Sequence, residues 1–65
     1  MGMKSFNIDD FVVCNNVNFG KIQGFDGTKA LVLHNEGRSN EYTKYYFLSV
    51  IRKATTEDIA RYLNG

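Results

Sequence analysis

Residues 19–34 decide the fold, and they read FGKIQGFDGTKALVLH. The pair Asp26-Gly27 separates two stretches rich in aromatic and β-branched residues, and an Asp-Gly pair in that setting is among the strongest hairpin signals. The sequence therefore predicts a strand over about 19–25, a tight turn at 26–27 and a second strand over about 28–34.

Two loop lengths fit this hairpin, and they place opposite faces of the strands in the core. A two-residue turn pairs Ile22 with Leu31. A three-residue loop that begins at Phe25 pairs Ile22 with Ala30, and Ile22, Ala30 and Val32 then share one face. A slip of one residue moves every side chain to the other face, so only one of the two registers is compatible with a packed core.

The rest of the chain predicts three more strands and one helix. Strands are expected at 11–14, at 42–47 and briefly around 51–52, with polar loops between them and a short turn at 48–50. Thr55 is a suitable N-cap for a helix over about 56–63, because Glu57 and Asp58 then lie in the first turn, where carboxylates suit the helix dipole. Ile59 and Tyr62 form part of its apolar stripe.

Two of the predicted strands are apolar on both faces, whereas a half-buried strand alternates apolar and polar residues. One face lines the core, and the other, made of Phe11, Val13, Leu31 and Leu33, needs a cover. Leaving such side chains in water forgoes roughly 1.5–3 kcal/mol for each of them. The cover is either the C-terminal helix, packed on the outside of the sheet, or a second protein chain.

Length and composition describe one small globular domain, residues 1–65. The apolar fraction is 43%, and eight basic residues nearly balance seven acidic ones, so the chain is neither a disordered polymer nor a strongly basic protein. Cys14 is the only cysteine, which excludes an internal disulfide framework. The N-terminal residues 1–6 lack the apolar stretch of a signal peptide, and we expect a cytoplasmic protein without a membrane segment.

The sequence offers little support for catalysis. Cys14 and His34 are the one conceivable nucleophile and base, but a small core thiol and a histidine at a strand end are the better interpretations. Asp9, Asp10 and Asp26 lack the spacing of metal ligands. We therefore expect no enzyme activity, no metal and no cofactor.

Two groups of residues predict binding instead. Tyrosine is a favoured anchor of protein interfaces, and the partner-binding residues expected on this basis are Phe19, Arg38, Tyr42 and Tyr45. Small barrels also bind single-stranded nucleic acid by stacking bases on aromatic rings beside cations. The residues expected for that alternative are Lys21, Lys29, Lys44 and Tyr45.

Three segments resemble small SH3-like barrels of bacterial phages and mobile elements. Phe6-x-Ile8-x-Asp10-x-Val12 resembles their first strand, residues 19–32 their central hairpin, and residues 48–59 their closing strand and appended helix. The resemblance implies a mainly β fold, an antiparallel barrel of four or five strands over about 6–53. It favours the three-residue hairpin loop, because Ile22, Ala30 and Val32 match positions that point into the barrel. Asp9 departs from it, since the pattern usually has glycine there.

The resemblance assigns no functional residue, because folds of this kind carry many unrelated functions. We expect a non-enzymatic protein-binding module, in the setting of the resemblance a phage or mobile-element accessory protein that acts on a host component. The alternative is a small barrel that binds single-stranded nucleic acid. The expected oligomeric state is a monomer or a weak homo-oligomer.

Overall fold

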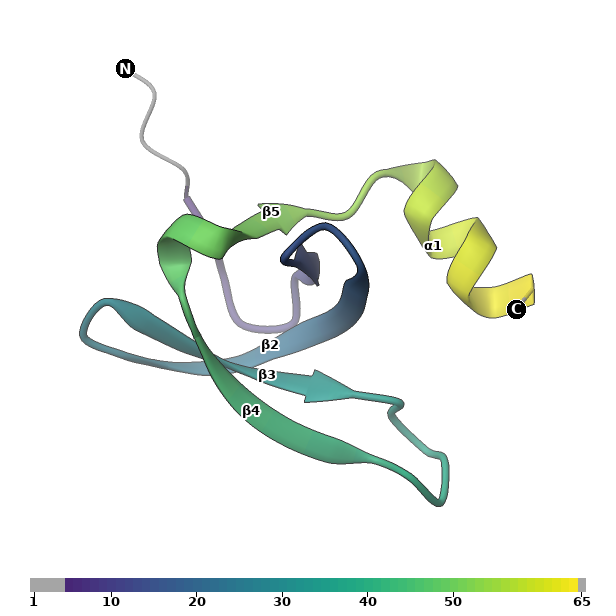
Figure 1. The fold of residues 1–65 in the computed structure, drawn as a ribbon, viewed down its shortest axis with the longest axis horizontal. Helices are drawn as coiled ribbons and strands as arrows, with labels where there is room; N and C mark the ends of the chain where they lie inside the picture. The colour runs from purple at the N-terminus through teal and green to yellow at the C-terminus, as the bar shows by residue number, and fades with distance from the viewer. Residues whose placement is uncertain (1–4, 65) are drawn as a thin grey trace.

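The computed structural model describes residues 5–64, and it is mainly β. The strands are β1 (Phe11–Cys14), β2 (Asn18–Asp26), β3 (Lys29–His34), β4 (Tyr42–Phe47) and β5 (Ile51–Lys53). A 3-10 turn (Leu48–Val50) joins β4 to β5, and the helix α1 (Thr56–Asn64) follows β5 (Figure 1). Residues 1–4, which carry part of the expectation about a signal peptide, and residue 65 lie outside the described part.

All five strands form one antiparallel sheet with the order β4-β3-β2-β1-β5. Successive strands from β1 to β4 are neighbours, and the chain then crosses through the 3-10 turn to pair β5 with β1 (Figure 1). The two end strands, β4 and β5, do not pair with each other. The sheet is therefore open between β4 and β5. The strands do not form the closed barrel that we expected.

The central hairpin has the predicted faces but a different turn. Gly27 and Thr28 form the turn, Asp26 pairs with Lys29, and the left-handed φ of +63° at Gly27 suits the first position of a type II′ turn. Both registers expected from the sequence are wrong, because a bulge at Gln23 shifts the ladder and pairs Ile22 with Val32. Without the bulge, the turn at Gly27 and Thr28 would pair Ile22 with Leu33. The bulge shifts the register by one residue, so Ile22 shares the inner face with Val32.

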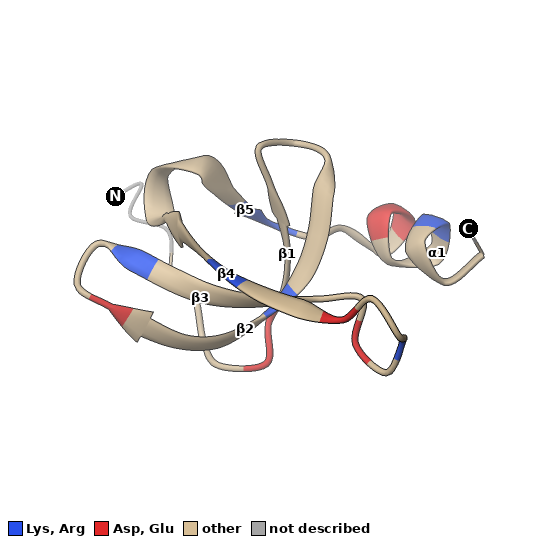
Figure 2. Ribbon diagram, turned by 60° about the horizontal axis from the view of Figure 1, so that its bottom comes forward, with Lys and Arg blue, Asp and Glu red and all other residues tan. Residues whose placement is uncertain are grey.

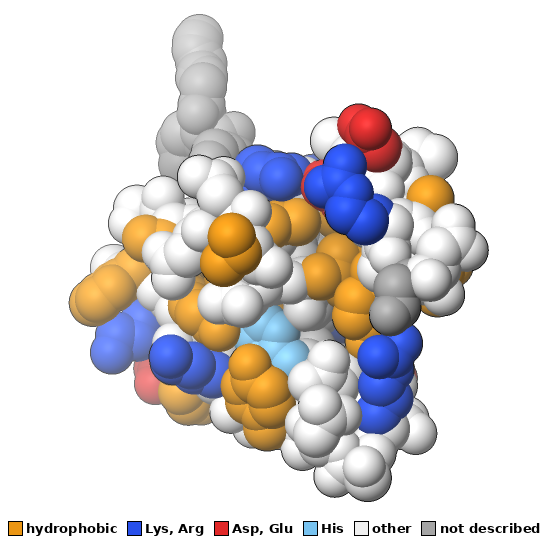
Figure 3. All heavy atoms as spheres, turned by 45° about the vertical axis from the view of Figure 1, so that its right-hand side comes forward, with side chains coloured by type: hydrophobic (Ala, Val, Ile, Leu, Met, Phe, Trp, Pro, Cys, Tyr) orange, Lys and Arg blue, Asp and Glu red, His pale blue; other side chains and the backbone are white. Residues whose placement is uncertain are grey.

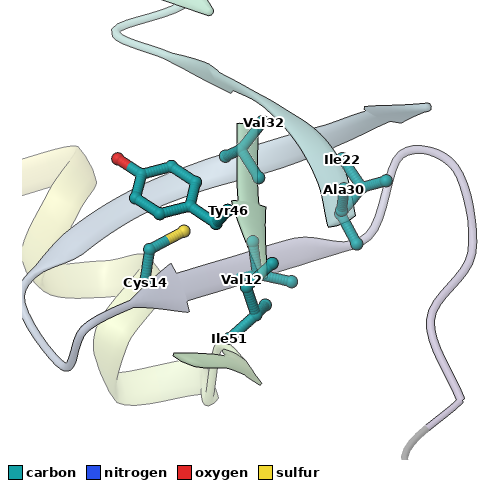
Figure 4. Close-up of a cluster of buried hydrophobic side chains, with 7 residues drawn as sticks. All are labelled: Val12, Cys14, Ile22, Ala30, Val32, Tyr46 and Ile51. Atoms are coloured by element: carbon teal, nitrogen blue, oxygen red, sulfur yellow. The ribbon is translucent and has the colours of Figure 1, made fainter. Parts of the chain in front are cut away.

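The core lies on the inner face of the sheet. Side chains from all five strands meet in it (Figure 4). The cluster consists of Val12, Cys14, Ile22, Ala30, Val32, Tyr46 and Ile51. Ile22, Ala30 and Val32 are fully buried, which confirms the predicted inward face. Burial also raises the pKa of the Cys14 thiol to about 11, as expected for a core cysteine rather than a reactive one.

The helix α1 lies against the outer face at the β1–β2 end of the sheet. Tyr62 stacks on Phe19, a neighbour of Val13 across the β1–β2 ladder, and Val13 is buried. No side chain of α1 is itself buried, and Phe11 stays 43% exposed. The helix thus touches the outer face mainly through Tyr62, and the cover expected over Phe11, Val13, Leu31 and Leu33 is formed only in part.

The approach to β1 differs from the expected extended strand. Residues 7–10 form a turn, closed by the Asp10 N–H, which donates to the Asn7 carbonyl at 3.1 Å, and β1 begins only at Phe11. Asp9 has a φ of +76° in this turn, the third position, where a type II turn requires glycine. Asp9 thus occupies a position whose backbone conformation favours glycine.

We predict that Asp9→Gly stabilises the protein. A left-handed conformation costs a non-glycine residue about 1–2 kcal/mol, whereas the added freedom of glycine in the unfolded chain costs about 0.4–1 kcal/mol. The net gain in the free energy of unfolding is therefore about 0.5 kcal/mol, measured by urea denaturation. Asp10→Gly is the control, and it should destabilise, because the Asp10 carboxylate accepts from the Asn7 N–H at 2.9 Å. Equal effects of the two changes would contradict the explanation.

Candidate functional site

A column of stacked groups joins α1 to the sheet. The ring centroids of Phe11 and Phe19 are 5.5 Å apart, and those of Phe19 and Tyr62 are 4.3 Å apart, with interplanar angles of 24° and 18°. The guanidinium carbon of Arg38 lies 5.1 Å from the centroid of the Tyr62 ring, so the column ends in a cation–π contact. Residues from β1, β2, the β3–β4 loop and α1 thus meet in one stack, which we call the aromatic column.

Asp58 fixes the start of α1 and so positions Tyr62. Its backbone N–H donates to the Thr55 hydroxyl at 3.1 Å, and its carboxylate accepts from the Thr55 N–H at 2.9 Å, which is the reciprocal arrangement of a capping box. The same carboxylate accepts from the Arg52 guanidinium of β5 at 2.7 Å. The N-cap predicted at Thr55 is confirmed, and the ion pair adds a link from the helix to the sheet.

We predict that acid weakens the attachment of α1 through Asp58. The Arg52 guanidinium and the Thr55 N–H hold the pKa of Asp58 well below its usual range. A lowered pKa in the folded state contributes stability above the unfolded value of about 4, and this contribution is lost as pH falls below it. The wild type should exceed Asp58→Asn in stability at pH 6, and the difference should shrink from about pH 4 downward in urea titrations followed by circular dichroism. A difference that is constant between pH 6 and pH 2 would contradict this.

His34 forms the floor of a hollow beside the aromatic column. Its Nδ1 donates to the Phe19 carbonyl at 2.8 Å, because a carbonyl only accepts. In the neutral imidazole, Nε2 then accepts from the Tyr46 hydroxyl at 2.9 Å. Burial raises the pKa of Tyr46, which keeps this hydroxyl protonated. Both ring nitrogens of His34 are thus engaged by groups other than Cys14.

The hollow itself is lined largely by rings. Its volume is about 250 Å³, and the histidine is visible between hydrophobic side chains in Figure 3. The lining residues are Val17, Asn18, Phe19, His34, Asn35, Tyr42 and Tyr62. The Tyr42 ring stacks on His34 with a centroid distance of 4.8 Å, so one face of Tyr42 is occupied within the protein.

The end strand β4 exposes large rings on both of its faces. Tyr46 is buried on the inner face, so Tyr42 and Lys44 share that face, while Tyr45 and Phe47 lie on the outer face. The exposed fractions are 47% for Tyr42, 50% for Tyr45 and 54% for Phe47. Three half-exposed aromatic rings thus lie on β4.

Basic and acidic residues are interspersed along the fold (Figure 2), but they differ in how they are paired. Lys21 forms an ion pair with Glu36, and the hydrogen bond between them raises the pKa of Lys21. The Lys29 Nζ lies 4.9 Å from the centroid of the Phe47 ring, and the Lys44 Nζ lies 5.4 Å from the centroid of the Tyr46 ring. Neither of these two lysines forms an ion pair within residues 5–64.

The predicted partner-binding residues fall at two places. Phe19 and Arg38 belong to the aromatic column, and Tyr42 lies nearby at the hollow, whereas Tyr45 projects from the outer face of β4. Of the residues predicted for nucleic acid, Lys29, Lys44 and Tyr45 lie along β3 and β4, and Lys21 is neutralised by Glu36.

From the sequence, Phe47 is grouped with the tyrosines of its strand but is not selected as a site residue, and neither is Tyr62. Tyr62 lies on the apolar stripe of the predicted helix, and this stripe was interpreted only as a cover for the sheet. Phe47 follows Tyr45 by two residues in a strand, so alternation places both on one face. This alternation was the signal that could have found Phe47.

No protein-family model, no curated protein and no solved structure matches this chain. Within residues 5–64, no helix has the length and apolar character needed to cross a bilayer.

Proposed function

We propose that this protein is a non-enzymatic protein-binding module and that its contact surface is β4, with Tyr42 and Tyr45 as the principal anchors. The observation that carries the proposal is that an end strand of the sheet exposes three large rings, at Tyr42, Tyr45 and Phe47. Exposed aromatic residues of this size contribute much of the energy of protein interfaces, since they bury a large area for few rotatable bonds.

The architecture supports the same proposal. A four-stranded meander whose fifth strand crosses over a 3-10 turn to pair with the first is the strand order of SH3-like folds, and we propose that the chain is an open member of that group. The role of a phage or mobile-element accessory protein rests on the sequence resemblance alone. Phe19 and Arg38 are assigned to holding α1, because both are engaged by Tyr62.

Nucleic-acid binding is the weaker alternative. Lys29, Lys44 and Tyr45 place two cations and a ring near one strand, but the formal net charge is only +1. Proteins that bind nucleic acid show a concentrated basic surface, because phosphate contacts supply most of their affinity. With Lys21 paired to Glu36, the cation expected on β2 is already neutralised.

The test is affinity capture from a native lysate with the double variant Tyr42→Ala and Tyr45→Ala. Loss of two anchor rings should reduce recovery of the strongest protein partner at least tenfold, because each anchor contributes on the order of 2 kcal/mol or more. The double variant Ile8→Ala and Leu63→Ala is the control, since it removes exposed apolar side chains away from β4. Its recovery should equal that of the wild type.

Two additional arms make the capture experiment decisive. Tyr42 packs on His34, so the single variant Tyr45→Ala, which leaves that stack intact, guards against an effect of unfolding. Nuclease treatment of the lysate separates direct protein partners from those bridged by nucleic acid. Unchanged recovery of the partner by a folded Tyr42→Ala and Tyr45→Ala variant would refute the proposal, and recovery that disappears with nuclease would favour the alternative.

A further inference from the structure

The backbone of β4 has one side without hydrogen-bond partners. The Leu48 N–H donates to the Thr28 carbonyl at 2.9 Å, which makes residues 28 and 48 a hydrogen-bonded pair of the β3–β4 ladder. Hydrogen-bonded and non-hydrogen-bonded pairs alternate in an antiparallel ladder. The N–H and C=O groups of Thr43, Tyr45 and Phe47 therefore point away from β3, toward the open edge.

Most of these outward groups are unsatisfied by the rest of the described chain. Within residues 5–64, no hydrogen bond reaches the outward groups of Thr43 and Tyr45 or the N–H of Phe47, and β4 has β3 as its only neighbour in the sheet. The Phe47 carbonyl is the exception, because Phe47 is the N-cap of the 3-10 turn and its carbonyl accepts the first hydrogen bond of that turn. Such an edge is a template for another strand, because each added pair satisfies a donor and an acceptor at once. The other end strand, β5, has only three residues, Ile51–Lys53, and offers a much shorter edge.

Side chains beside the edge define which strand fits. Tyr45 and Phe47 flank it on the outer face, while Lys44 flanks it on the inner face. A residue opposite Tyr45 or Phe47 in an added strand meets an aromatic ring, which favours a β-branched or aromatic side chain. A residue opposite Lys44 meets a cation that has no carboxylate partner in residues 5–64, which favours aspartate or glutamate.

The same lysine argues against a second copy of this chain as the occupant. Pairing two β4 edges brings two copies of Lys44 to one short ladder, where like charges destabilise the pairing. A lysine on an exposed edge is also a common device against edge-to-edge association. The chemistry of the edge thus disfavours its own copy and favours an acidic strand.

We infer that β4 binds an extended acidic segment of a partner protein as an added strand. Apolar residues of the segment pack beside Tyr45 and Phe47, and an acidic residue next to the one opposite Tyr45, on the Thr43 side, pairs with Lys44. This inference rests on the proposed protein-binding function and specifies the partner by its chemistry. Main-chain hydrogen bonds from Thr43, Tyr45 and Phe47 contribute affinity, and the alternating side chains contribute specificity.

The test is an NMR titration of the isotope-labelled protein with a synthetic eight-residue peptide of alternating valine and glutamate. The expected result is saturable shifts of the Thr43, Tyr45 and Phe47 amides, with at least tenfold slower hydrogen exchange at these three positions. A matched valine–lysine peptide should bind at least tenfold more weakly. Lys44→Glu should reverse the preference between the two peptides, and Lys44→Gln should remove it.

Controls separate strand addition from other modes of contact. Lys53→Glu makes the same charge change on the opposite edge and should leave the wild-type preference unaltered. The valine–glutamate peptide with its β4-facing nitrogens methylated should not bind. Equal binding of the methylated peptide, or shifts confined to α1, would overturn strand addition. A single-stranded oligonucleotide that shifts β4 amides at concentrations where the peptide does not would overturn it in favour of nucleic acid.

Failure of strand addition can be distinguished from failure of the proposed protein-binding function. If lysate capture depends on Tyr42 and Tyr45 while the peptide leaves the β4 amides unshifted, the chain is a binding module but not an acceptor of an acidic strand. If the capture is independent of both tyrosines and the peptide also fails, both proposals are wrong.

Discussion

Gly20→Ala should lower the free energy of unfolding by about 3 kcal/mol, at the upper end of the cost of overpacking a core. A Cβ atom at Gly20 would overlap with the Val32 Cγ1 and would lie 2.9 Å from the Leu33 carbonyl oxygen and 3.1 Å from the His34 Cε1. Val32 is β-branched and fully buried, and the carbonyl belongs to the sheet, so neither atom can move without disturbing the core.

This loss is large for so small a domain, whose whole stability is about 3–10 kcal/mol at the usual value per residue. The melting temperature should fall by roughly 12–24 °C in thermal unfolding followed by circular dichroism. Gly24→Ala is the matched control, because a Cβ at Gly24 meets nothing within 4 Å and lies in the same strand. If the two variants melted within about 3 °C of each other, the steric argument would be contradicted, because that difference is smaller than the shift for 1 kcal/mol.

Tyr46→Phe should lower the free energy of unfolding by about 2 kcal/mol. The substitution removes the hydroxyl that donates to His34 Nε2 at 2.9 Å, and it leaves that nitrogen without a partner in a side chain that is only 3% exposed. A buried acceptor that loses its partner costs about 1–3 kcal/mol, because water does not replace the lost bond. The His34 Nδ1 keeps its bond to the Phe19 carbonyl, so the ring does not need to turn.

Tyr45→Phe removes the hydroxyl group of the adjacent tyrosine and serves as the control. Tyr45 is half-exposed, so its hydroxyl loses only contact with water and stability should stay within about 0.5 kcal/mol of the wild type. Both variants can be compared by urea denaturation at pH 7. Equal stability of the two phenylalanine variants would show that the bond between Tyr46 and His34 contributes nothing net to folding.

The strands and the inward face were predictable because they depend on local patterns. The alternation of Ala30 and Val32 with Leu31 and Leu33 specifies two faces, and burial of the first pair follows from having one core. The turn was predicted one residue too early. The inward face was still predicted correctly, because the bulge at Gln23 compensates for the shift. Gly24 beside the bulge was the available signal, because an isolated glycine inside a strand often marks a bulge, but it does not fix which residue is unpaired.

The candidate site was less predictable than the fold, because its contacts join distant parts of the chain. Tyr42 and Tyr45 were recognised from composition and from their place on a short strand, but only the strand order shows that β4 is an end strand. The stack of Phe19 on Tyr62 depends on the direction in which α1 leaves β5. The ion pair of Arg52 with Asp58 links the start of α1 to β5, and no local pattern predicts it.

The strand order also determines how this chain reaches its native state. Three of the four pairings join consecutive strands, whereas the fourth joins Cys14 of β1 to Ile51 of β5. Closing a long loop costs entropy before its contacts are gained, and such distant contacts slow folding. We therefore expect the local pairings from β1 to β4 to form first and Ile51 to reach the core late in folding.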